Sequence, residues 1–339
     1  MPRKKIIQIL LLVGTIISLY FVPWILVKAW ILPLPKTIQE QVDKSINLGF
    51  DGTIVYVDQA GKAPELYTAG WHNREHKISA KPDALYKIAS ISKLYVAVAI
   101  SKLVSNNRLS LDKTLAEYFP ELKERIQYAN QITLRMMVQH RSGIPNFTNY
   151  PNYWENPPNN YNGKLNLILD APASFKPGED YEYSNTNYLL IRQLIDKTLG
   201  YSRNQYIKDE ILVPLQLNNT FFSLDEVDLD KVMSGYHIGY DLDLKTEEQG
   251  MLATAQDVGV FLRALNNGSV FKNGEQEIYS KIYKYEHSGW VPGYQSFAEY
   301  HQDIDTVIVL FNNTTDAKLY MWNLSEIILN RIAKIIKKR

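Results

Sequence analysis

The sequence predicts an α+β fold, an α/β sandwich in which helices flank an antiparallel sheet and an all-helical lobe is inserted. Two strand-like segments, 50–59 and 65–73, lie early in the chain, and two more, 293–302 and 305–314, lie late. Most of the segments between them have helical periodicity. Strands at both ends with helices between them indicate one sheet assembled from distant segments, with the helical lobe spanning roughly 106–232.

The N-terminal segment 1–32 is predicted to be a cytoplasmic tip followed by a transmembrane helix. Arg3, Lys4 and Lys5 precede an uncharged run over 6–27. As a helix rising about 1.5 Å per residue, this run would cross the roughly 30 Å core of a bilayer. No small-residue cleavage site follows it, and the basic charges before it favour a cytoplasmic N-terminus. We therefore expect a single-pass, uncleaved anchor with the rest of the chain in the periplasm or outside the cell.

The remaining chain, 33–339, is predicted to form one domain, since 45% hydrophobic residues allow a substantial core. The 37 basic and 36 acidic residues nearly cancel, so a nucleic-acid partner has no electrostatic support. The chain has no cysteine, which excludes disulfides, thiol nucleophiles and Cys-ligated metals. Its six histidines do not form an HExxH spacing. We expect neither a metal nor a cofactor.

The local pattern predicts each element in turn. Alternating or apolar runs predict the strands, and a Gly-Lys-Ala-Pro turn at 61–64 joins the first two. Apolar spacing with Asn, Pro or Gly at the ends predicts helices at 37–48, 110–119, 133–140, 186–200, 251–268 and 319–338. The polar, proline-rich stretch 148–163 is typical of a surface loop or a lid near a cleft.

The segment 86–100 places a serine and a lysine three residues apart at the start of an otherwise apolar helix. Positions i and i+3 share a helix face, so Lys93 can reach the Ser90 hydroxyl. Burial favours a neutral amine, which can take the proton of the serine and create a nucleophile. Ser110 and Ser269 have lysines at the same spacing, but we expect Ser110 to cap an exposed helix and Ser269 to lie in a turn. Ser90 is therefore the predicted nucleophile.

A second candidate group follows a turn at Pro177 and Gly178. Tyr183 is placed to exchange protons with Lys93, and Asn185 to orient both side chains. An apolar helix begins just after them, which would fix the loop that carries the tyrosine. Two other Tyr-x-Asn triplets in the chain lack this combination of a preceding turn and a following helix. We therefore expect Tyr183 and Asn185 to complete the catalytic group.

A third group, His287, Ser288 and Gly289, precedes a Pro-Gly turn and a strand. This order predicts an edge strand that borders a cleft. The backbone N–H of Trp290 is a candidate to stabilise an oxyanion together with that of the nucleophile. His237 lies in a similar His-x-Gly triplet, but no Pro-Gly turn follows it. We expect the strand that starts at His287 to contact the substrate.

Together, the three groups resemble the serine β-lactamase and penicillin-binding-protein superfamily, in its class C-like branch. The resemblance extends from about residue 38 to the last helix and includes the flanking segments 110–121, 132–147 and 250–268. It implies Ser90 as the nucleophile, Lys93 as its lysine, Tyr183 and Asn185 as the second motif, and His287, Ser288 and Gly289 as the third. It also implies a hydrolase that forms an acyl-enzyme and acts on D-amino-acid peptides or esters of the cell envelope, like the D,D-carboxypeptidases and esterases of the branch. With the N-terminal segment, this predicts a membrane-anchored enzyme.

The third motif departs from that of the β-lactamases in this family, which usually have a lysine followed by a threonine. His287 is expected to be only partly charged near neutral pH, and so a weaker anchor for a substrate carboxylate. The resemblance therefore favours a peptidase or esterase over a dedicated β-lactamase. A β-lactamase, a lipid-directed esterase and a non-catalytic envelope-binding module are the alternatives. The expected partners are a small-molecule or peptidoglycan-like substrate and the membrane.

Overall fold

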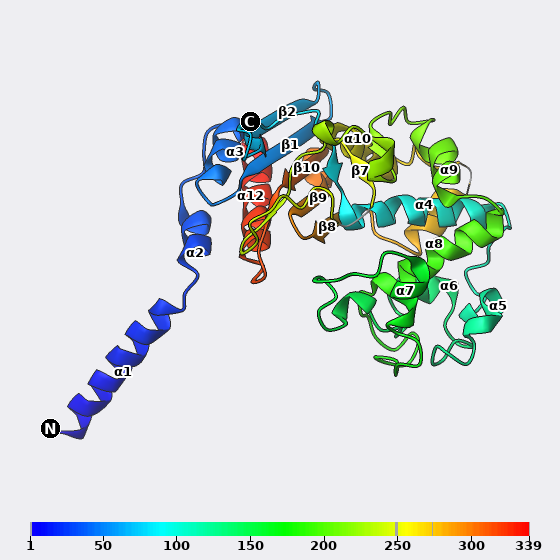
Figure 1. Ribbon diagram of the computed structural model, residues 1–339. Helices are drawn as coiled ribbons and strands as arrows, with labels where there is room; N and C mark the ends of the chain where they lie inside the picture. The colour runs from blue at the N-terminus through cyan, green and yellow to red at the C-terminus, as the bar shows by residue number, and fades with distance from the viewer. Residues whose placement is uncertain (1, 248–249, 273, 339) are drawn as a thin grey trace.

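The computed structural model describes residues 2–247, 250–272 and 274–338. A six-stranded antiparallel sheet in the order β3-β2-β1-β10-β9-β8 forms its centre (Figure 1). The strands are β1 (Gly52–Gln59), β2 (Glu65–Asn73), β3 (Ile78–Ser79), β8 (His287–Val291), β9 (Tyr294–His301) and β10 (Thr306–Asn312). Early and late parts of the sequence meet in the sheet, where β1 pairs with β10 along nearly its whole length. The prediction of one sheet assembled from distant segments is confirmed.

Both faces of the sheet are buried, because helices cover each of them (Figure 1). The covering helices are α3 (Ile38–Ile46), α10 (Ala255–Asn267) and α12 (Tyr320–Lys337). Ile54 and Tyr56 of β1 face α10 and the larger core, whereas Val55 and Val57 face α3 and α12. Close packing of α10 depends on Gly259, since a Cβ there would lie 2.1 Å from the Tyr56 ring. Successive side chains of β1 thus point to opposite faces of the sheet, and both sets are buried against helices.

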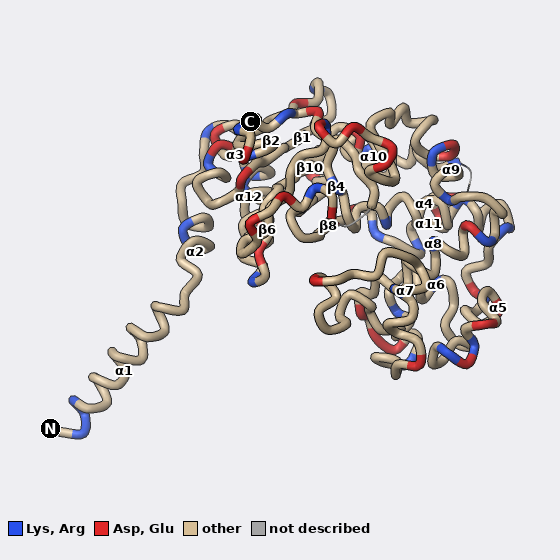
Figure 2. Tube along the Cα trace, in the orientation of Figure 1, with Lys and Arg blue, Asp and Glu red and all other residues tan. Residues whose placement is uncertain are grey.

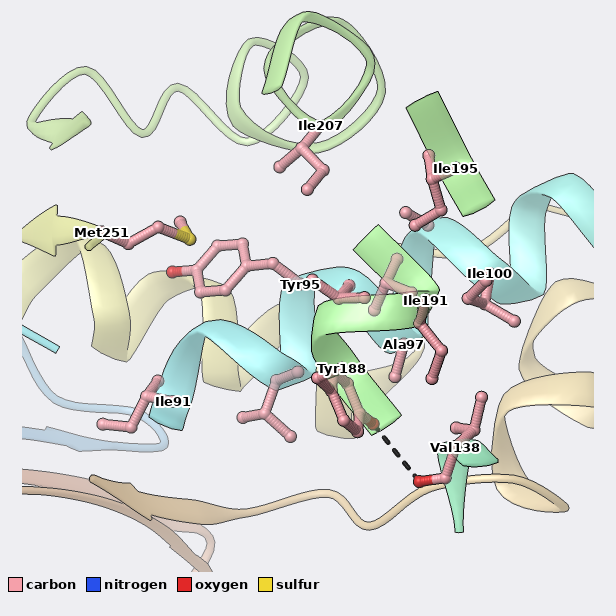
Figure 3. Close-up of a cluster of buried hydrophobic side chains, with 14 of the residues drawn as sticks. Ile91, Tyr95, Ala97, Ile100, Val138, Tyr188, Ile191, Ile195, Ile207 and Met251 are labelled. Atoms are coloured by element: carbon pink, nitrogen blue, oxygen red, sulfur yellow. Dashed lines mark hydrogen bonds between the residues drawn. The ribbon is translucent and has the colours of Figure 1, made fainter. Parts of the chain in front are cut away.

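The inserted lobe is built around two buried helices, α4 and α8 (Figures 1 and 3). Its helices are α4 (Ser92–Ser105), α5 (Leu115–Tyr118), α6 (Leu134–Val138), α7 (Tyr161–Asn166), α8 (Asn185–Leu199), α9 (Arg203–Ile207) and α11 (Glu275–Ser280). The lobe therefore extends beyond the predicted 106–232, since α4 precedes that range and α11 follows it. Figure 3 shows Ala97 of α4 beside Ile191 of α8, and Tyr188 Oη donates a hydrogen bond to the carbonyl of Val138 at 3.4 Å. Every residue of α4 from 92 to 103 is buried. Any charged side chain near its start therefore lies in a nonpolar setting.

The helix predicted over 110–119 is shorter in the structure, because a different residue caps it. Only α5 is helical, and Thr114 caps it by accepting a hydrogen bond from the Glu117 N–H. The Glu117 carboxylate accepts one from the Thr114 N–H in return, which completes a capping box. Ser110 is not the cap that the sequence suggested. Its backbone N–H and carbonyl instead hydrogen-bond to the hydroxyl of Tyr118.

Two small sheets complete the fold. One contains β4 (Tyr86–Lys87), β7 (Leu252–Ala253) and β5 (Thr220–Phe221), and the other contains β6 (Tyr236–His237) and β11 (Thr314–Thr315). Strand β7 occupies the start of the segment 251–268 that was predicted to be wholly helical. Helix α10 therefore begins only after Thr254, whose hydroxyl accepts a hydrogen bond from the Asp257 N–H.

The predicted transmembrane helix is broken in the structure. Pro23, which lacks an N–H, separates α1 (Arg3–Tyr20) from α2 (Trp24–Ile31), and the pair is bent by 79°. Within the described residues, no single helix is long and apolar enough to cross a membrane, but this bent pair qualifies by length and composition. Helix α1 projects away with no buried residue, and its basic residues lie at its outer end (Figures 1 and 2). The end of α2 is attached to α12, since Arg331 donates a hydrogen bond to the carbonyl of Leu32.

Candidate active site

Ser90 lies in a short 3₁₀ turn, η1 (Ala89–Ile91), that leads directly into α4. The residue before it, Ala89, has a φ angle of 47°, in the left-handed region that residues other than glycine rarely adopt. Strained backbone of this kind persists where the surrounding structure fixes it, and it is frequent at active sites. The predicted position of Ser90 at a helix start is therefore nearly correct, with α4 itself beginning two residues later.

Lys93 lies in the first turn of α4 and is only 3% exposed. Its Nζ is 3.0 Å from Ser90 Oγ and 2.9 Å from Asn185 Oδ1. Burial lowers the pKa of Lys93 well below its usual value, and the charges of Arg192 and Lys284 lower it further. The neutral amine is favoured, as the sequence predicted. Such an amine can accept the proton of Ser90.

Tyr183 approaches the same hydroxyl, with its Oη 2.8 Å from Ser90 Oγ. Burial raises the pKa of Tyr183 to about 12, so the phenol keeps its proton near neutral pH. His140 supports the loop from behind: its Nδ1 accepts the backbone N–H that follows Tyr183 at 3.2 Å, and the two rings lie 4.5 Å apart. Asn185 then starts α8. A base and a protonated acid thus contact one hydroxyl.

The alternatives weighed from the sequence lie outside this cluster. Ser110 and Ser269 are exposed. His237 has its Nδ1 2.8 Å from the Thr315 hydroxyl, next to the small β6–β11 sheet. In the part of the chain that the structure describes, no three His, Cys, Asp or Glu side chains are grouped so that they could hold a metal ion.

His287 lines the cleft from the start of β8, but its imidazole is already engaged. Nδ1 donates to the carbonyl of Ser288, so in the neutral ring Nε2 accepts from the hydroxyl of Tyr283, at 2.9 Å. Burial lowers the pKa of His287 well below its usual value, and the charges of Lys284 and Lys93 act in the same direction. The expectation of a partly charged His287 near neutral pH is therefore wrong. The sequence could not show that this imidazole is buried near Lys284 and Lys93.

The backbone of β8 presents Trp290 to its open edge. A two-residue turn, 292–293, joins β8 to β9, so the pair beside the turn is hydrogen-bonded and the next pair, Trp290 opposite Gln295, is not. The Trp290 N–H therefore points away from β9, off the edge of the sheet. Gly289 lets β8 approach the turn that carries the serine, since a Cβ there would lie 2.5 Å from the carbonyl oxygen of Ile88.

One cleft of about 900 Å³ is lined by the side chains of both groups, namely Ser90, Lys93, Tyr183, Asn185, His287, Ser288 and Trp290. Trp154, from the predicted surface loop, contacts Trp290 edge to face with ring centroids 5.3 Å apart. The sequence did not indicate two other lining residues. Asn146 accepts a hydrogen bond from the Asn185 N–H at 3.0 Å, and Arg192 lies farther along α8. Neither belongs to a recognisable pattern, so only the folded chain brings them to the site.

Comparison with known proteins identifies the family of this chain. A family model described as Beta-lactamase matches residues 37–281. Protein flp of Staphylococcus aureus (strain MW2) is 31% identical over 195 residues, which are 56% of this chain and 39% of that protein. A putative D-alanyl-D-alanine carboxypeptidase of Escherichia coli (strain K12) is 28% identical over 207 residues, 56% of this chain and 46% of that protein. The chain thus spans less than half the length of these curated relatives.

Solved structures share the fold over most of the chain. The D-amino acid amidase from Ochrobactrum anthropi SV3 matches with a TM-score of 0.78 at 21% identity, covering 89% of this chain and 97% of that chain. A penicillin binding protein from Bacillus halodurans matches with a TM-score of 0.72 at 18% identity, covering 87% of this chain and 99% of that chain. Because the family match extends over well more than half of the sequence, this chain belongs to the beta-lactamase family of serine hydrolases.

Proposed function

We propose that the chain forms an acyl-enzyme at Ser90 and hydrolyses peptides, amides or esters of D-amino acids in the cell envelope. The observation that carries the proposal is the double contact of Ser90 Oγ, 3.0 Å from the Lys93 amine and 2.8 Å from the Tyr183 hydroxyl. A structural serine needs neither a buried neutral lysine nor a protonated tyrosine at its hydroxyl. A nucleophile in acyl transfer needs both, one to take a proton and one to give it.

Acylation follows from these contacts. Lys93 takes the proton of Ser90 while Oγ forms a bond to the substrate carbonyl carbon, and the carbonyl electron pair moves onto oxygen. The N–H groups of Trp290 and Ser90 stabilise that negative charge. When the tetrahedral intermediate collapses, the bond to the leaving group breaks and the leaving group takes a proton from Tyr183. Tyr183 regains a proton from Lys93, so the amine is neutral again and Ser90 carries the acyl group.

Deacylation uses the same groups in reverse. The Tyr183–Lys93 pair removes a proton from a water molecule as the water oxygen bonds to the acyl carbon. The bond to Ser90 Oγ then breaks, and Ser90 recovers its proton from Lys93. Asn185 keeps the amine oriented through both halves, since its Oδ1 lies 2.9 Å from Nζ. The cycle releases a carboxylic acid and needs no group beyond these side chains and water.

The substrate class rests on the names of similar proteins and on the third motif. A D-amino acid amidase and a putative D-alanyl-D-alanine carboxypeptidase are among the proteins that resemble this chain. The β-lactamase alternative is less well supported, because this chain has His287 and Ser288 where the β-lactamases of the family usually have a lysine and a threonine. Turnover of D-Ala-D-Ala peptides, D-amino-acid amides, nitrocefin and p-nitrophenyl esters would rank the candidates.

Labelling with a fluorescent fluorophosphonate tests the nucleophile. We expect one adduct in the intact protein, located by digestion and mass spectrometry in the peptide that contains Ser90. Ser90→Ala should abolish labelling, whereas the matched control Ser110→Ala should keep it. An adduct on another serine, or unchanged labelling in Ser90→Ala, would overturn the assignment. Absence of any adduct in the folded protein would favour the non-catalytic binding module instead.

We also propose that α1 and α2 anchor the chain in a membrane with the domain outside the cytoplasm. Leu10, Leu11 and Leu12 of α1 are between 61% and 66% exposed, and apolar surface of this kind favours lipid over water. Alkaline phosphatase fused after residue 40 should be active, and the full-length chain should sediment with membranes. Recovery of a shortened soluble form would show that the segment is a cleaved signal peptide.

A further inference from the structure

The cleft has a strongly one-sided charge. Among the described residues that line it, five are basic and none is acidic. The five are Lys93, Lys164, Arg192, Arg203 and Lys284. Arg203 forms an ion pair with Asp196, which compensates its charge. Burial lowers the pKa values of Lys93 and Lys284, which reduces their charge. Arg192 and Lys164 are the two remaining basic residues of the cleft, and of these only Arg192 is on α8, the helix that begins at Asn185.

Arg192 is held in place without a countercharge. Its Nη2 donates to the hydroxyl of Ser92 at 2.9 Å, and this is the hydrogen bond that the described residues give it. No described carboxylate pairs with it, and the charge of Arg203 acts on it unfavourably. A guanidinium has five N–H donors, so most of its hydrogen-bonding capacity is unused. An uncompensated cation in a nonpolar cleft is costly unless a ligand brings the opposite charge.

We propose that Arg192 binds a carboxylate on the acyl part of the substrate. The inference rests on the proposed function, since it assigns part of the same substrate. Carboxylates match the planar fork of a guanidinium, which can donate two parallel hydrogen bonds to them. The hydroxyl of Ser92 fixes one nitrogen of a side chain that lines the cleft, and the other donors have no hydrogen-bond partner among the described residues. A neutral acyl group would leave the charge of Arg192 unpaired.

The position of Arg192 along α8 indicates which part of the substrate carries the carboxylate. It follows Asn185 by seven residues, two helical turns or about 10 Å along the axis. Tyr183 precedes the helix at the other end, and as the proton donor it must face the leaving group. Arg192 therefore lies on the side of the acyl chain. The guanidinium contacts Ser92, two residues after the nucleophile, so it can reach a carboxylate that is separated from the scissile carbonyl by several bonds.

Hydrolysis of a matched ester pair tests the site. The mono-p-nitrophenyl ester of adipic acid has a free carboxylate, and its methyl ester is neutral. In the wild type, kcat/KM should favour the anionic ester, and Arg192→Gln should lower this preference at least about tenfold, as loss of a charge-assisted hydrogen bond implies. Arg192→Lys should keep part of it. Lys164→Gln, the matched control within the cleft, should keep most of it.

Two outcomes would overturn the inference. If Arg192→Gln lowered kcat/KM equally for both esters, Arg192 would act on the catalytic group or on folding rather than on substrate charge. If Lys164→Gln reduced the preference as much, the general potential of the cleft would explain it. In either case the proposed hydrolysis at Ser90 would still stand.

A binding experiment separates this inference from the proposed function. In the Ser90→Ala protein, calorimetry with monomethyl adipate and dimethyl adipate measures recognition without chemistry. We expect tighter binding of the anion, and loss of the difference when Arg192→Gln is added. That result would support the carboxylate site even if the wild type hydrolysed neither ester. Equal binding of both compounds by Ser90→Ala would overturn the site even if the wild type hydrolysed both.

Discussion

The two walls of the cleft present different parts of the chain to the substrate. The helical wall, formed by α4, α8 and the loop before α8, presents the side chains of Ser90, Lys93 and Tyr183. The sheet wall, formed by β8, presents a backbone N–H at Trp290 and a neutral imidazole at His287 that is already hydrogen-bonded. The motifs near helix starts thus contribute mainly side chains to the site, whereas the motif on the edge strand contributes mainly a backbone N–H group.

Hydrogen bonding explains this difference. Beyond its first turn, a helix uses its backbone N–H groups internally, so side chains spaced three or four residues apart are the groups that converge on a ligand. An edge strand leaves every second N–H unpaired, and these groups are available to a substrate. The glycine of the third motif fits the same view, since its missing side chain lets β8 pass within contact of η1.

The largest expected effect lies on the helical wall. Lys93→Ala and Tyr183→Phe should each slow acylation by about 10²–10⁴-fold, the usual contribution of a general acid or base. Because both side chains contact one hydroxyl, the double variant should lose far less than the product of the two single losses. Rapid-quench measurement of the acyl-enzyme gives the rates, and circular dichroism shows that the variants are folded.

Independent action of the two residues would contradict this picture. If the double variant lost the full product, Lys93 and Tyr183 would serve separate steps, and the shared contact with Ser90 would have no mechanistic meaning. Lys102→Met is a matched control in the same helix. Lys102 is as buried as Lys93, but it pairs with Glu275 at 2.8 Å, so its loss should reduce stability and leave the acylation rate of the folded protein nearly unchanged.

A smaller effect is expected on the sheet wall. Trp290→Pro removes the N–H that points off the edge of β8, and proline is tolerated at such edge positions. Loss of one oxyanion donor typically lowers kcat by about 10²–10³-fold. Trp290→Ala keeps the N–H and removes only the indole, so it is the control. Equal losses in the two variants would show that the side chain, and not the backbone, matters at this position.

Much of the fold and most of the candidate site could be predicted from the sequence. Strand β2 has the bounds that alternation indicated, 65–73, and the chain ends pair in one sheet as expected. Ser90, Lys93, Tyr183 and Asn185 come together because their types and local contexts are set by neighbouring residues. Each stands at the start of a helix or in the loop just before one, where short-range signals are strongest.

The rest depends on contacts between distant segments. Arg192 has an ordinary place in an amphipathic helix, and nothing nearby in the sequence shows that it contacts Ser92 of α4. The charge state of His287 depends on its burial beside Lys93 and Lys284. Pro23 is the exception, because a proline inside an apolar run by itself indicates a break in a helix, whereas the transmembrane prediction rests on hydropathy and charge alone.

The smallest expected effect is shared by both walls and concerns stability. His140 supports the helical wall and His287 lies in the sheet wall, and burial lowers the pKa of both, to about 3 for His140. Below pH 6.5 a histidine in the unfolded chain becomes protonated, whereas these two histidines in the folded protein remain neutral. The unfolded state therefore binds more protons, and the free energy of unfolding must fall as the pH falls below about 6.5.

The size of this effect follows from the proton linkage. At pH 5, His140, with its pKa of about 3, should lower the free energy of unfolding by about 2 kcal/mol relative to pH 7, since one pH unit below the unfolded pKa is worth about 1.4 kcal/mol. His287 should act in the same direction. Urea unfolding at the two pH values measures it. His140→Asn, which can still accept the hydrogen bond from the loop, and His287→Gln should each be less stable at pH 7 but lose less on acidification than the wild type. If acidification lowered the free energy of unfolding of His287→Gln as much as that of the wild type, the His287 imidazole would become charged in the folded protein. The two walls would then differ in charge as well as in the groups that they present.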